Sequence, residues 1–347
     1  MNQYDDKYEI RLASRNDIDA IMNFIDEKWA KGHVLSIDRS LFEYEFCEGD
    51  SVNFVLAINR ERQSIDGVLG FLRCSNTDDG DRKAVWGSIW KTVNTEDALP
   101  FLGIELAKRV YPISGARYFI GNGANPRTSI RLRKLFFHSI TVRLNQHYIY
   151  NTSLPSLHLA DIKKPYEQNY LSEQHIKVKP IQCLDEFEGF IDLRDYPAIP
   201  YKDSWYVEKR FFRHPYYHYS LWGISGASAE RAVVVAREVS YEGAKALRIV
   251  DYYGTQTLFS YTGSFWKDLM EDCSYEYIDF YEYGFDQDSI SKAGFLMRKE
   301  GDVNIIPNYF EPFVKKNVDI WGHFEREGTR IFKADGDQDR PNILRRL

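Results

Sequence analysis

The chain has 347 residues, of which 44% are hydrophobic, 15% aromatic and 28% charged, a composition typical of a globular protein with room for two domains. Its formal net charge of -6 argues against general nucleic-acid binding, because that function needs a basic face to neutralise phosphates. The four cysteines show no Cys-x-x-Cys spacing and the histidines are scattered, so we expect reduced thiols and no metal site.

Two further features bear on where the protein works. Residues 1–7 are polar and lack an apolar core, so we expect no signal peptide. No run approaches the ~20 apolar residues that a membrane helix needs, so we expect no membrane insertion and a cytoplasmic protein.

The N-terminal part of the chain begins with a strand and two helices. Alternation predicts a strand at 9–13, and Ile18, Ile21, Met22 and Ile25 have the spacing of one helical face. The next predicted elements are a polar loop at 28–38, a helix at 39–46, and strands at 52–58, 67–72 and 84–93. The polar turn between the strands at 52–58 and 67–72 predicts a hairpin.

A helix, a strand, a second helix and a closing strand follow. Pro100 fits the first turn of the first of these helices. The remaining predicted elements of this half are a strand at 116–121, a helix opened by Asn125, and a closing strand at 141–150.

The second half repeats this order. After a proline-containing connector at 152–178, we expect strands at 217–223, 231–240, 245–253 and 277–283, with helices at 265–270 and 288–297. The repeated pattern predicts an α/β (α+β) protein with an N-terminal domain at 1–151 and a C-terminal domain at 179–347 that ends in a polar tail.

At this point the chain resembles the GNAT superfamily of acyl-CoA N-acyltransferases. The order of elements carries the resemblance, and the N-terminal half is also similar to a subgroup associated with bacterial surface-polysaccharide (O-antigen or capsule) biosynthesis. The segments that carry this similarity are 24–29, 31–36, 42–44, 52–55, 101–104, 144–148 and, in the tail, 335–342. The second half resembles a diverged GNAT copy.

The resemblance implies two tandem GNAT-like domains, each a mixed central sheet flanked by helices, with acetyl-CoA or another acyl-CoA as cosubstrate. It places residues 89–93 beside the thioester and residues 95–106 beside the phosphates, where a helix N-terminus favours anions. The candidate cofactor-binding residues are Trp90, Lys91, Thr92, Val93, Phe101, Leu102, Gly103, Asn125 and Arg131.

Several positions depart from the family pattern. Gly103 matches the last glycine of the phosphate loop, but Phe101 stands where the other glycine is expected. Leu132 and Ile290 occupy the positions of the tyrosine that many GNAT enzymes use as general acid. These departures imply that another residue supplies the proton or that one or both halves have lost CoA binding.

Four residues are candidates for acid–base catalysis: His33, Glu43, Tyr148 and Asp279. His33 lies in the polar loop and has an unperturbed pKa near ~6.5; it could act as a base, or it could be a loop histidine that bonds locally. Glu43 lies two residues from Glu45 on a helix, so the two cannot share a face. Tyr148 could replace the missing acid or pack in the core, and Asp279 could be a base or a buried, hydrogen-bonded carboxylate.

Two groups of charged residues each allow two interpretations. Arg127, Arg131, Arg133 and Lys134 form either a solvated helix face or a contact with the phosphates of CoA or a nucleotide sugar. The tail carboxylates Asp335, Asp337 and Asp339 are either solvated or fold back onto a cationic amine or sugar. They lack the length and terminal Glu of a calcium loop.

We therefore expect an N-acyltransferase that moves an acyl group, in the simplest case acetyl, from acyl-CoA to the amine of an amino sugar, nucleotide-linked, in surface-polysaccharide biosynthesis. The alternative is a catalytically degenerate GNAT pair that binds a sugar or nucleotide, or serves as a structural partner. The expected partner is an amino-sugar or nucleotide-sugar substrate, and the sequence leaves room for a homodimer.

Overall fold

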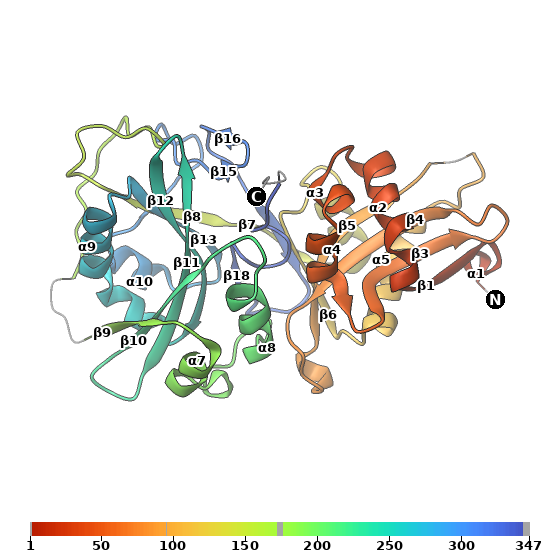
Figure 1. The fold of residues 1–347 in the computed structure, drawn as a ribbon, viewed down its shortest axis with the longest axis horizontal. Coiled ribbons are helices and arrows are strands. Elements are labelled where there is room, and N and C mark those ends of the chain that lie inside the picture. Colours follow the sequence, from red (N-terminus) through yellow and green to blue (C-terminus); the bar gives the residue numbers. More distant parts are fainter. Residues whose placement is uncertain (1, 95, 172–175, 343–347) are drawn as a thin grey trace. The chain divides into compact units, whose positions relative to one another are not determined.

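The computed structural model describes residues 2–94, 96–171 and 176–342, and the chain divides into two compact units (Figure 1). Unit 1 comprises Met1–Thr141, Trp321–Glu327 and Arg340–Leu347, and unit 2 comprises Val142–Ile320 and Gly328–Asp339. Each unit thus includes residues from both halves of the sequence. This division differs from the expected boundary at residue 151. Thr95 and residues 172–175 of the expected connector lie outside the described residues.

Unit 1 is built on a mixed sheet with the order β1-β3-β4-β5-β6-β17-β7, in which β2 also pairs with β3. The strands are β1 Tyr8–Ser14, β2 Cys47–Glu48, β3 Ser51–Asn59, β4 Ile65–Arg73, β5 Ala84–Thr92, β6 Tyr118–Asn122, β7 Ile140–Arg143 and β17 Trp321–Phe324. The helices are α1 Gln3–Lys7, α2 Ile18–Phe24 with its π-helical continuation Ile25–Trp29, α3 Val34–Ile37, α4 Arg39–Phe46, α5 Leu102–Ser114 and α6 Ser129–Phe137. The neighbours β5 and β6 are parallel.

Unit 2 repeats this arrangement, with the sheet order β9-β10-β11-β12-β13-β8-β14 and β18 pairing with β13. The strands are β8 Asn145–Tyr150, β9 Lys177–Ile181, β10 Ser220–Ser225, β11 Arg231–Tyr241, β12 Ala244–Gly254, β13 Tyr277–Tyr283, β14 Leu296–Met297 and β18 Ile331–Phe332, beside a separate pair β15 Tyr309–Phe310 and β16 Phe313–Val314. The helices are α7 Leu184–Phe190, α8 Ser204–Val207 with the π-helical Glu208–Phe212, α9 Gly263–Cys273 and α10 Gln287–Lys292. Again one neighbouring pair, β12 and β13, is parallel.

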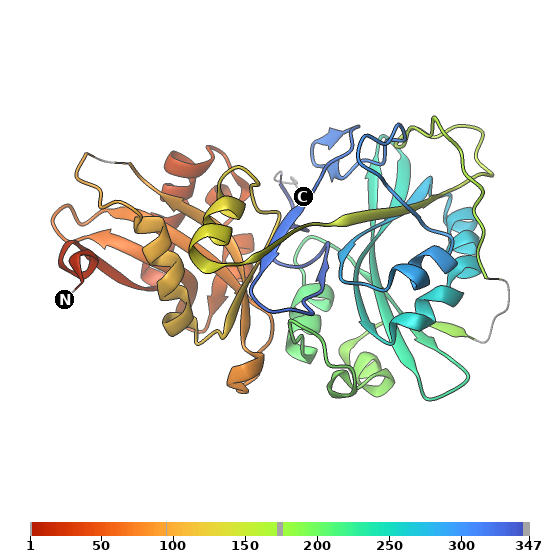
Figure 2. The same ribbon diagram turned by 180° about the vertical axis from the view of Figure 1, so that it is seen from behind.

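The expected closing strand at 141–150 is two strands in two different sheets. Only Leu144 separates β7 from β8, and the ribbon shows them as one extended run (Figure 2). β7 ends the sheet of unit 1, whereas β8 lies between β13 and β14 in unit 2. The place that β8 fills in unit 2 is filled in unit 1 by β17, which comes from the far end of the chain. The two units have therefore exchanged equivalent strands.

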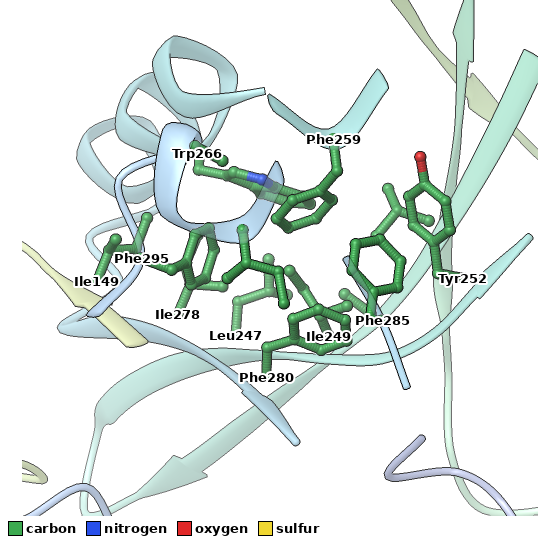
Figure 3. Close-up of a cluster of buried hydrophobic side chains, with 14 of the residues drawn as sticks. Ile149, Leu247, Ile249, Tyr252, Phe259, Trp266, Ile278, Phe280, Phe285 and Phe295 are labelled. Carbon is green, nitrogen blue, oxygen red and sulfur yellow. The ribbon is translucent and has the colours of Figure 1, made fainter. Parts of the chain in front are cut away.

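The strongest strand signal in the sequence is the apolar run of β11. Val233 and Val235 face one buried cluster, which α7 and α8 help to form, while Val234 faces a second buried cluster beneath α9. A β-branched run that is buried on both faces is typical of a central strand. The second cluster mixes aliphatic and aromatic side chains, and its aromatic members include Phe259, Trp266, Phe280, Phe285 and Phe295 (Figure 3).

One expectation for unit 2 is wrong. The helix expected at 288–297 ends at Lys292, because Gly294 has a φ of 89° and the chain then turns back to place β14 against β8. The C-terminal segment is buried from Ile331 to Asp335, which agrees with the fold-back alternative for the tail. Its charged side chains find partners within the unit, as described below.

Candidate functional site: the bulged strands of the two units

β5 has a β-bulge at the point where it leaves its parallel neighbour. Opposite the single residue Gly70 of β4 lie two residues of β5, Ser88 and Ile89. The last pair between β5 and β6 is Gly87 with Gly121, although β5 continues to Thr92. A bulge bends the strand that carries it, so the end of β5 diverges from β6.

The diverging end of β5 is only partly covered. Ser88, Trp90, Lys91 and Thr92 are half-buried, as is Val93 just beyond the strand. Four of these five residues were expected to line the acyl-CoA site. The fold thus brings Trp90 to Val93 to a strand end that has lost its parallel partner and is reached by solvent.

The start of α5 lies against this strand end. The Trp90 Nε1–H donates to the Gly103 carbonyl at 3.0 Å, and a Cβ on residue 103 would lie 3.2 Å from that nitrogen. Glycine is therefore favoured at 103 for close packing. None of the described side chains caps α5, so its positive dipole end is available to an anion.

Phe101, the residue before α5, has a strained backbone. Its φ of 61° lies in the left-handed region that favours glycine, and its side chain is 62% exposed. Its ring packs against Phe136 of α6 with centroids 5.5 Å apart. Phe101 stands where the resemblance to GNAT proteins implies a glycine, and its contact with Phe136 joins the start of α5 to the end of α6.

The four basic residues before and within α6 do not all lie on one exposed face of the helix. Arg127, Arg131 and Lys134 are exposed, whereas Arg133 is 1% exposed. Its guanidinium lies 3.6 Å from the centroid of the Phe119 ring, and none of its nitrogens has a hydrogen-bond partner among the described residues. Burial lowers the pKa of Arg133 to about 10. Arg133 is therefore a cation stacked in the core.

The two remaining cofactor candidates lie on the surface around α6. The exposed Asn125 accepts the Arg127 N–H at 2.9 Å and so shapes the turn before the helix. Arg131 is exposed on the helix itself. Their contact with a cofactor stays a prediction.

His33 and Glu43 lie in unit 1, on the helices that follow β1. His33 is half-buried and caps α3, because its Nδ1 accepts the Leu35 N–H at 3.2 Å. A neutral ring that accepts at Nδ1 carries its proton on Nε2, so Nε2 is a donor in this arrangement. Glu43 accepts a hydrogen bond from Arg39 at 2.7 Å, while Glu45 is buried against Arg340 at 3.0 Å.

Unit 2 has the same bulge, in β12. Val250 is the extra residue, because Val235 pairs with Asp251 while Ala236 pairs with Ile249. The parallel pairing of β12 with β13 ends at Ile249 and Phe280. Both units thus have a bulge where the two parallel strands part.

In unit 2 the C-terminal segment fills the place between the diverging strands. β18 pairs with β13 at Glu282 and Tyr283, and the Ala334 N–H donates to the Val250 carbonyl at 2.9 Å. Residues 250–253 are accordingly buried, unlike the half-buried end of β5. The chain's own backbone therefore occupies in unit 2 the position that is partly open in unit 1.

A buried lysine between two carboxylates fixes this segment. The Lys202 ammonium lies 2.8 Å from Asp251 and 2.6 Å from Asp335, and both carboxylates are fully buried. Burial, and then the charge of Asp251, raise the pKa of Asp335 to about 6 against the opposing pull of Lys202. The tail carboxylate thus meets a cationic amine, which belongs to the protein.

Asp339 makes a second buried ion pair. Its carboxylate accepts from Arg237 at 2.6 Å and from the Tyr219 hydroxyl at 2.9 Å. Burial alone would raise the pKa of Asp339, but the charge and hydrogen bonds of Arg237 outweigh it and hold that pKa well below its usual range. Asp337, by contrast, is half-buried.

Tyr148 and Asp279 both lie inside unit 2. The Tyr148 hydroxyl accepts from the Asn304 amide at 2.8 Å, and burial raises its pKa. Both oxygens of Asp279 accept from the Arg248 guanidinium at 2.8 Å. Tyr148 is thus packed in the core with its hydroxyl hydrogen-bonded, and Asp279 is a buried, hydrogen-bonded carboxylate.

Lys202, Arg237 and Arg248 give no signal in the sequence, although they organise the buried polar groups of unit 2. Lys202 and Asp251 lie 49 residues apart, and Arg237 and Asp339 lie 102 apart. No local spacing connects such pairs. The Asp-rich tail is the one sequence feature that could have indicated these cations, since carboxylates that become buried when the tail folds back need cationic partners.

Comparison with known proteins defines the fold. No protein-family model matches the chain, and no curated protein matches it. A GCN5-related N-acetyltransferase from Anabaena variabilis superposes with a TM-score of 0.54 at 12% identity, covering 91% of this chain and 72% of that one. A conserved protein of unknown function from Enterococcus faecalis, described as a probable N-acyltransferase, gives 0.55 at 8% identity, covering 91% and 71%.

The chain therefore has a GNAT-type fold. The expected fold class, mixed α/β with two mixed sheets flanked by helices, is confirmed. Identities this low show a shared fold and leave activity open. Within the residues that the structure describes, no group of three or more His, Cys, Asp or Glu side chains is placed to hold a metal ion. None of the described helices is long and apolar enough to cross a membrane.

Proposed function

We propose that this chain is an N-acyltransferase that moves an acyl group, in the simplest case acetyl, from acyl-CoA to the amine of an amino sugar, nucleotide-linked, in surface-polysaccharide biosynthesis. The observation that carries the proposal is the end of β5, where the bulge at Ser88 and Ile89, the lost parallel partner and the half-buried surface coincide. A strand edge with unpaired amides can bind the amide-containing arm of CoA as another strand would.

The start of α5 supports the position of the phosphates. In the proposed complex the acyl group lies along Trp90 to Val93 and the pyrophosphate lies at Leu102 and Gly103. No side chain among the described residues caps the helix, so its first N–H groups and its dipole favour an anion there. Gly103 lets the backbone come close to the ligand.

Unit 1 is the better donor site of the two. In unit 2 the equivalent position holds Ala334, bonded to Val250, and the ion pair of Asp335 with Lys202 holds the segment in place. A ligand at that position would displace the segment that carries Asp335 and separate it from Lys202, and breaking a buried ion pair is strongly destabilising.

Acyl transfer to an amine also needs the acceptor nitrogen to lose a proton, directly or through water. His33 remains a candidate on the helices of unit 1. While it caps α3 through Nδ1, it offers an N–H at Nε2 and acts as a hydrogen-bond donor. To serve as base, its ring must first release the Leu35 N–H, which predicts that α3 loosens when the acceptor binds.

The donor site is tested at Phe101. We expect acetyl-CoA to raise the melting temperature of the full chain, because a ligand that binds only the folded state stabilises it. Phe101→Glu places a negative charge at the start of α5 and should weaken acetyl-CoA binding about tenfold or more, roughly 1.4 kcal/mol. Phe101→Gly removes the strain and should tighten it.

The matched control is Leu135→Glu, because Leu135 is a 68% exposed apolar residue of α6 and receives the same change. Its affinity for acetyl-CoA, measured by calorimetry, should equal that of the unmodified chain. No thermal shift with acetyl-CoA or CoA at millimolar concentration would refute the donor site. Equal effects of the two glutamate variants would refute its location.

A second candidate, a GNAT-type pair that binds a ligand without acyl transfer, is favoured by one observation. The contact of Phe101 with Phe136 joins the start of α5 to the end of α6 and places an aromatic ring where the GNAT pattern has a glycine, at position 101. Binding of an amino-sugar nucleotide with no response to acetyl-CoA would support this candidate against the first.

A further inference from the structure

Unit 2 contains a pocket that lies against one side of α9. Its lining comes from α9, the end of β8, the segment at 166–170 and the turn after α10, and its volume is about 290 Å³. Ligand pockets in proteins commonly measure ~300–1,000 Å³, so this one suits a single ring better than a nucleotide. Its described lining shares no residue with the proposed donor site.

The segment at 166–170 is fixed to β8. The Tyr166 hydroxyl donates to the Tyr148 carbonyl at 2.7 Å, and the Gln168 side-chain amide donates to the Tyr150 carbonyl at 2.8 Å. The Tyr150 and Tyr166 rings also meet edge to face, with centroids 5.5 Å apart. This wall of the pocket is therefore in place before a ligand binds, which lowers the entropy cost of binding.

A third tyrosine, Tyr170, packs against two glycines. A Cβ on Gly263, the first residue of α9, would overlap the Tyr170 Cβ, and a Cβ on Gly294 would lie 3.4 Å from it. Tyr150, Tyr166 and Tyr170 all line the pocket. Tyrosine offers both an apolar ring face and a polar hydroxyl, which suits the mixed surface of a sugar.

The charged residues of the pocket leave it with more negative than positive charge. Glu167, Lys267 and Glu271 line it, and all three side chains are exposed. None of the three forms an ion pair with another residue that the structure describes, although Glu271 accepts a hydrogen bond from the Ser153 hydroxyl at 3.2 Å. Two carboxylates beside one ammonium therefore favour a cationic group in the ligand and disfavour a phosphate.

We propose that this pocket binds an amino sugar in its unacylated form, as a single ring whose protonated amine pairs with Glu167 or Glu271. Lys267 bonds the hydroxyls of the sugar, and the tyrosines contact its ring. Unit 2 is then a sugar-recognition unit. Its occupant has the chemistry of the proposed acceptor, but the site does not depend on acyl transfer, so its test uses no acyl-CoA and can succeed where the donor site fails.

The experiment is calorimetry on the full chain with glucosamine and galactosamine, each compared with its neutral hexose, its N-acetylated form and its 6-phosphate. Exposed ion pairs are individually weak, so we expect at least one amino sugar to bind about fivefold more tightly than its neutral hexose. N-acetylation removes the positive charge and a phosphate adds a negative one, so each should weaken binding.

The double variant Glu167→Gln with Glu271→Gln should remove this preference. Binding of the amino sugar should weaken about fivefold, while binding of the neutral hexose should not change, which separates a charge contact from a general loss of the pocket. Tyr170→Ala, by contrast, should weaken the binding of both sugars alike. The control is Glu188→Gln, an exposed carboxylate on α7, which packs on the opposite face of the sheet from α9 and should leave both affinities unchanged.

Four results would each overturn the proposal: equal affinity for the amino sugar and its neutral hexose, a double variant that keeps the preference, tighter binding of the 6-phosphate, or no binding of either amino sugar at millimolar concentration. None of these results bears on the donor site, because that site is tested separately with acetyl-CoA.

Discussion

Lys333 is a buried lysine that forms no ion pair with any residue that the structure describes. Its side chain is 4% exposed, and its ammonium donates to the Gln338 carbonyl at 2.9 Å. Burial and then the charge of Arg248 lower its pKa to about 7. The residues around it, Asp339 with Arg237 and Asp279 with Arg248, are already paired. At the residue scale, unit 2 therefore tolerates this amine best when it is neutral.

This predicts an unusual dependence of stability on pH. Because the pKa of Lys333 is lower in the folded chain than in the unfolded chain, the unfolded state binds more protons between about pH 7 and 10. The free energy of unfolding should therefore rise with pH there, by about 2 kcal/mol from pH 7 to pH 9. Chemical unfolding of Lys333→Met at both pH values should lack this rise, while the exposed-site control Lys299→Met should keep it. Equal slopes for both variants would contradict the assignment.

At the scale of elements, the exchanged strand β17 is fitted closely to its neighbour β6. His323 pairs with Gly121, its ring stacks on Phe119 with centroids 5.9 Å apart, and burial lowers its pKa well below its usual value. A Cβ on Gly121 would lie 2.2 Å from the His323 ring nitrogen Nε2. The close pairing of β6 with β17, two segments about two hundred residues apart, thus requires glycine at position 121.

We expect Gly121→Ala to lower the free energy of unfolding by about 2 kcal/mol or more, because overpacking a filled site forces neighbouring groups apart. The double variant Gly121→Ala with His323→Ala should recover part of that loss. Gly189→Ala in α7, where an added Cβ meets nothing within 4 Å, should change stability by less than about 1 kcal/mol and in the favourable direction. Denaturant unfolding measures all three, and full stability of the single variant would contradict the contact.

At the scale of the whole molecule, neither unit is a continuous piece of chain. The sheet of unit 1 needs β17 between β6 and β7, and unit 2 needs β8 between β13 and β14. Cutting the chain at the expected boundary after residue 151 therefore leaves β6 and β7 without the strand between them. Unpaired edges of that kind favour aggregation over folding.

We predict that a fragment of residues 1–151 does not unfold cooperatively in a thermal melt followed by circular dichroism. The same fragment joined through a flexible linker to residues 319–327 should regain a cooperative transition, because the linker supplies β17. A linked control in which Gly121 is replaced by Trp should not regain it. A cooperative melt of the simple fragment would contradict the role given to the exchanged strand.

The sequence by itself determined the local elements and the GNAT-type order. The apolar run predicted a strand at 231–240, the polar turn between 58 and 67 predicted a hairpin, and the strand predicted at 84–93 is β5, which ends at Thr92. These features depend on side-chain periodicity and turn residues, which act over a few positions.

Only the tertiary structure decided which sheet each strand joins and which buried charges meet. The run at 141–150 is predicted as one strand, because nothing within its sequence indicates that its two halves pair with different partners. No local sequence pattern connects Lys202 with Asp335, since their ion pair forms only when the C-terminal segment lies between the diverging strands β12 and β13. Long-range strand pairing and burial select these contacts. The repeated sequence pattern is the same in both halves, so only these long-range contacts distinguish the partly open end of β5 in unit 1 from the filled end of β12 in unit 2.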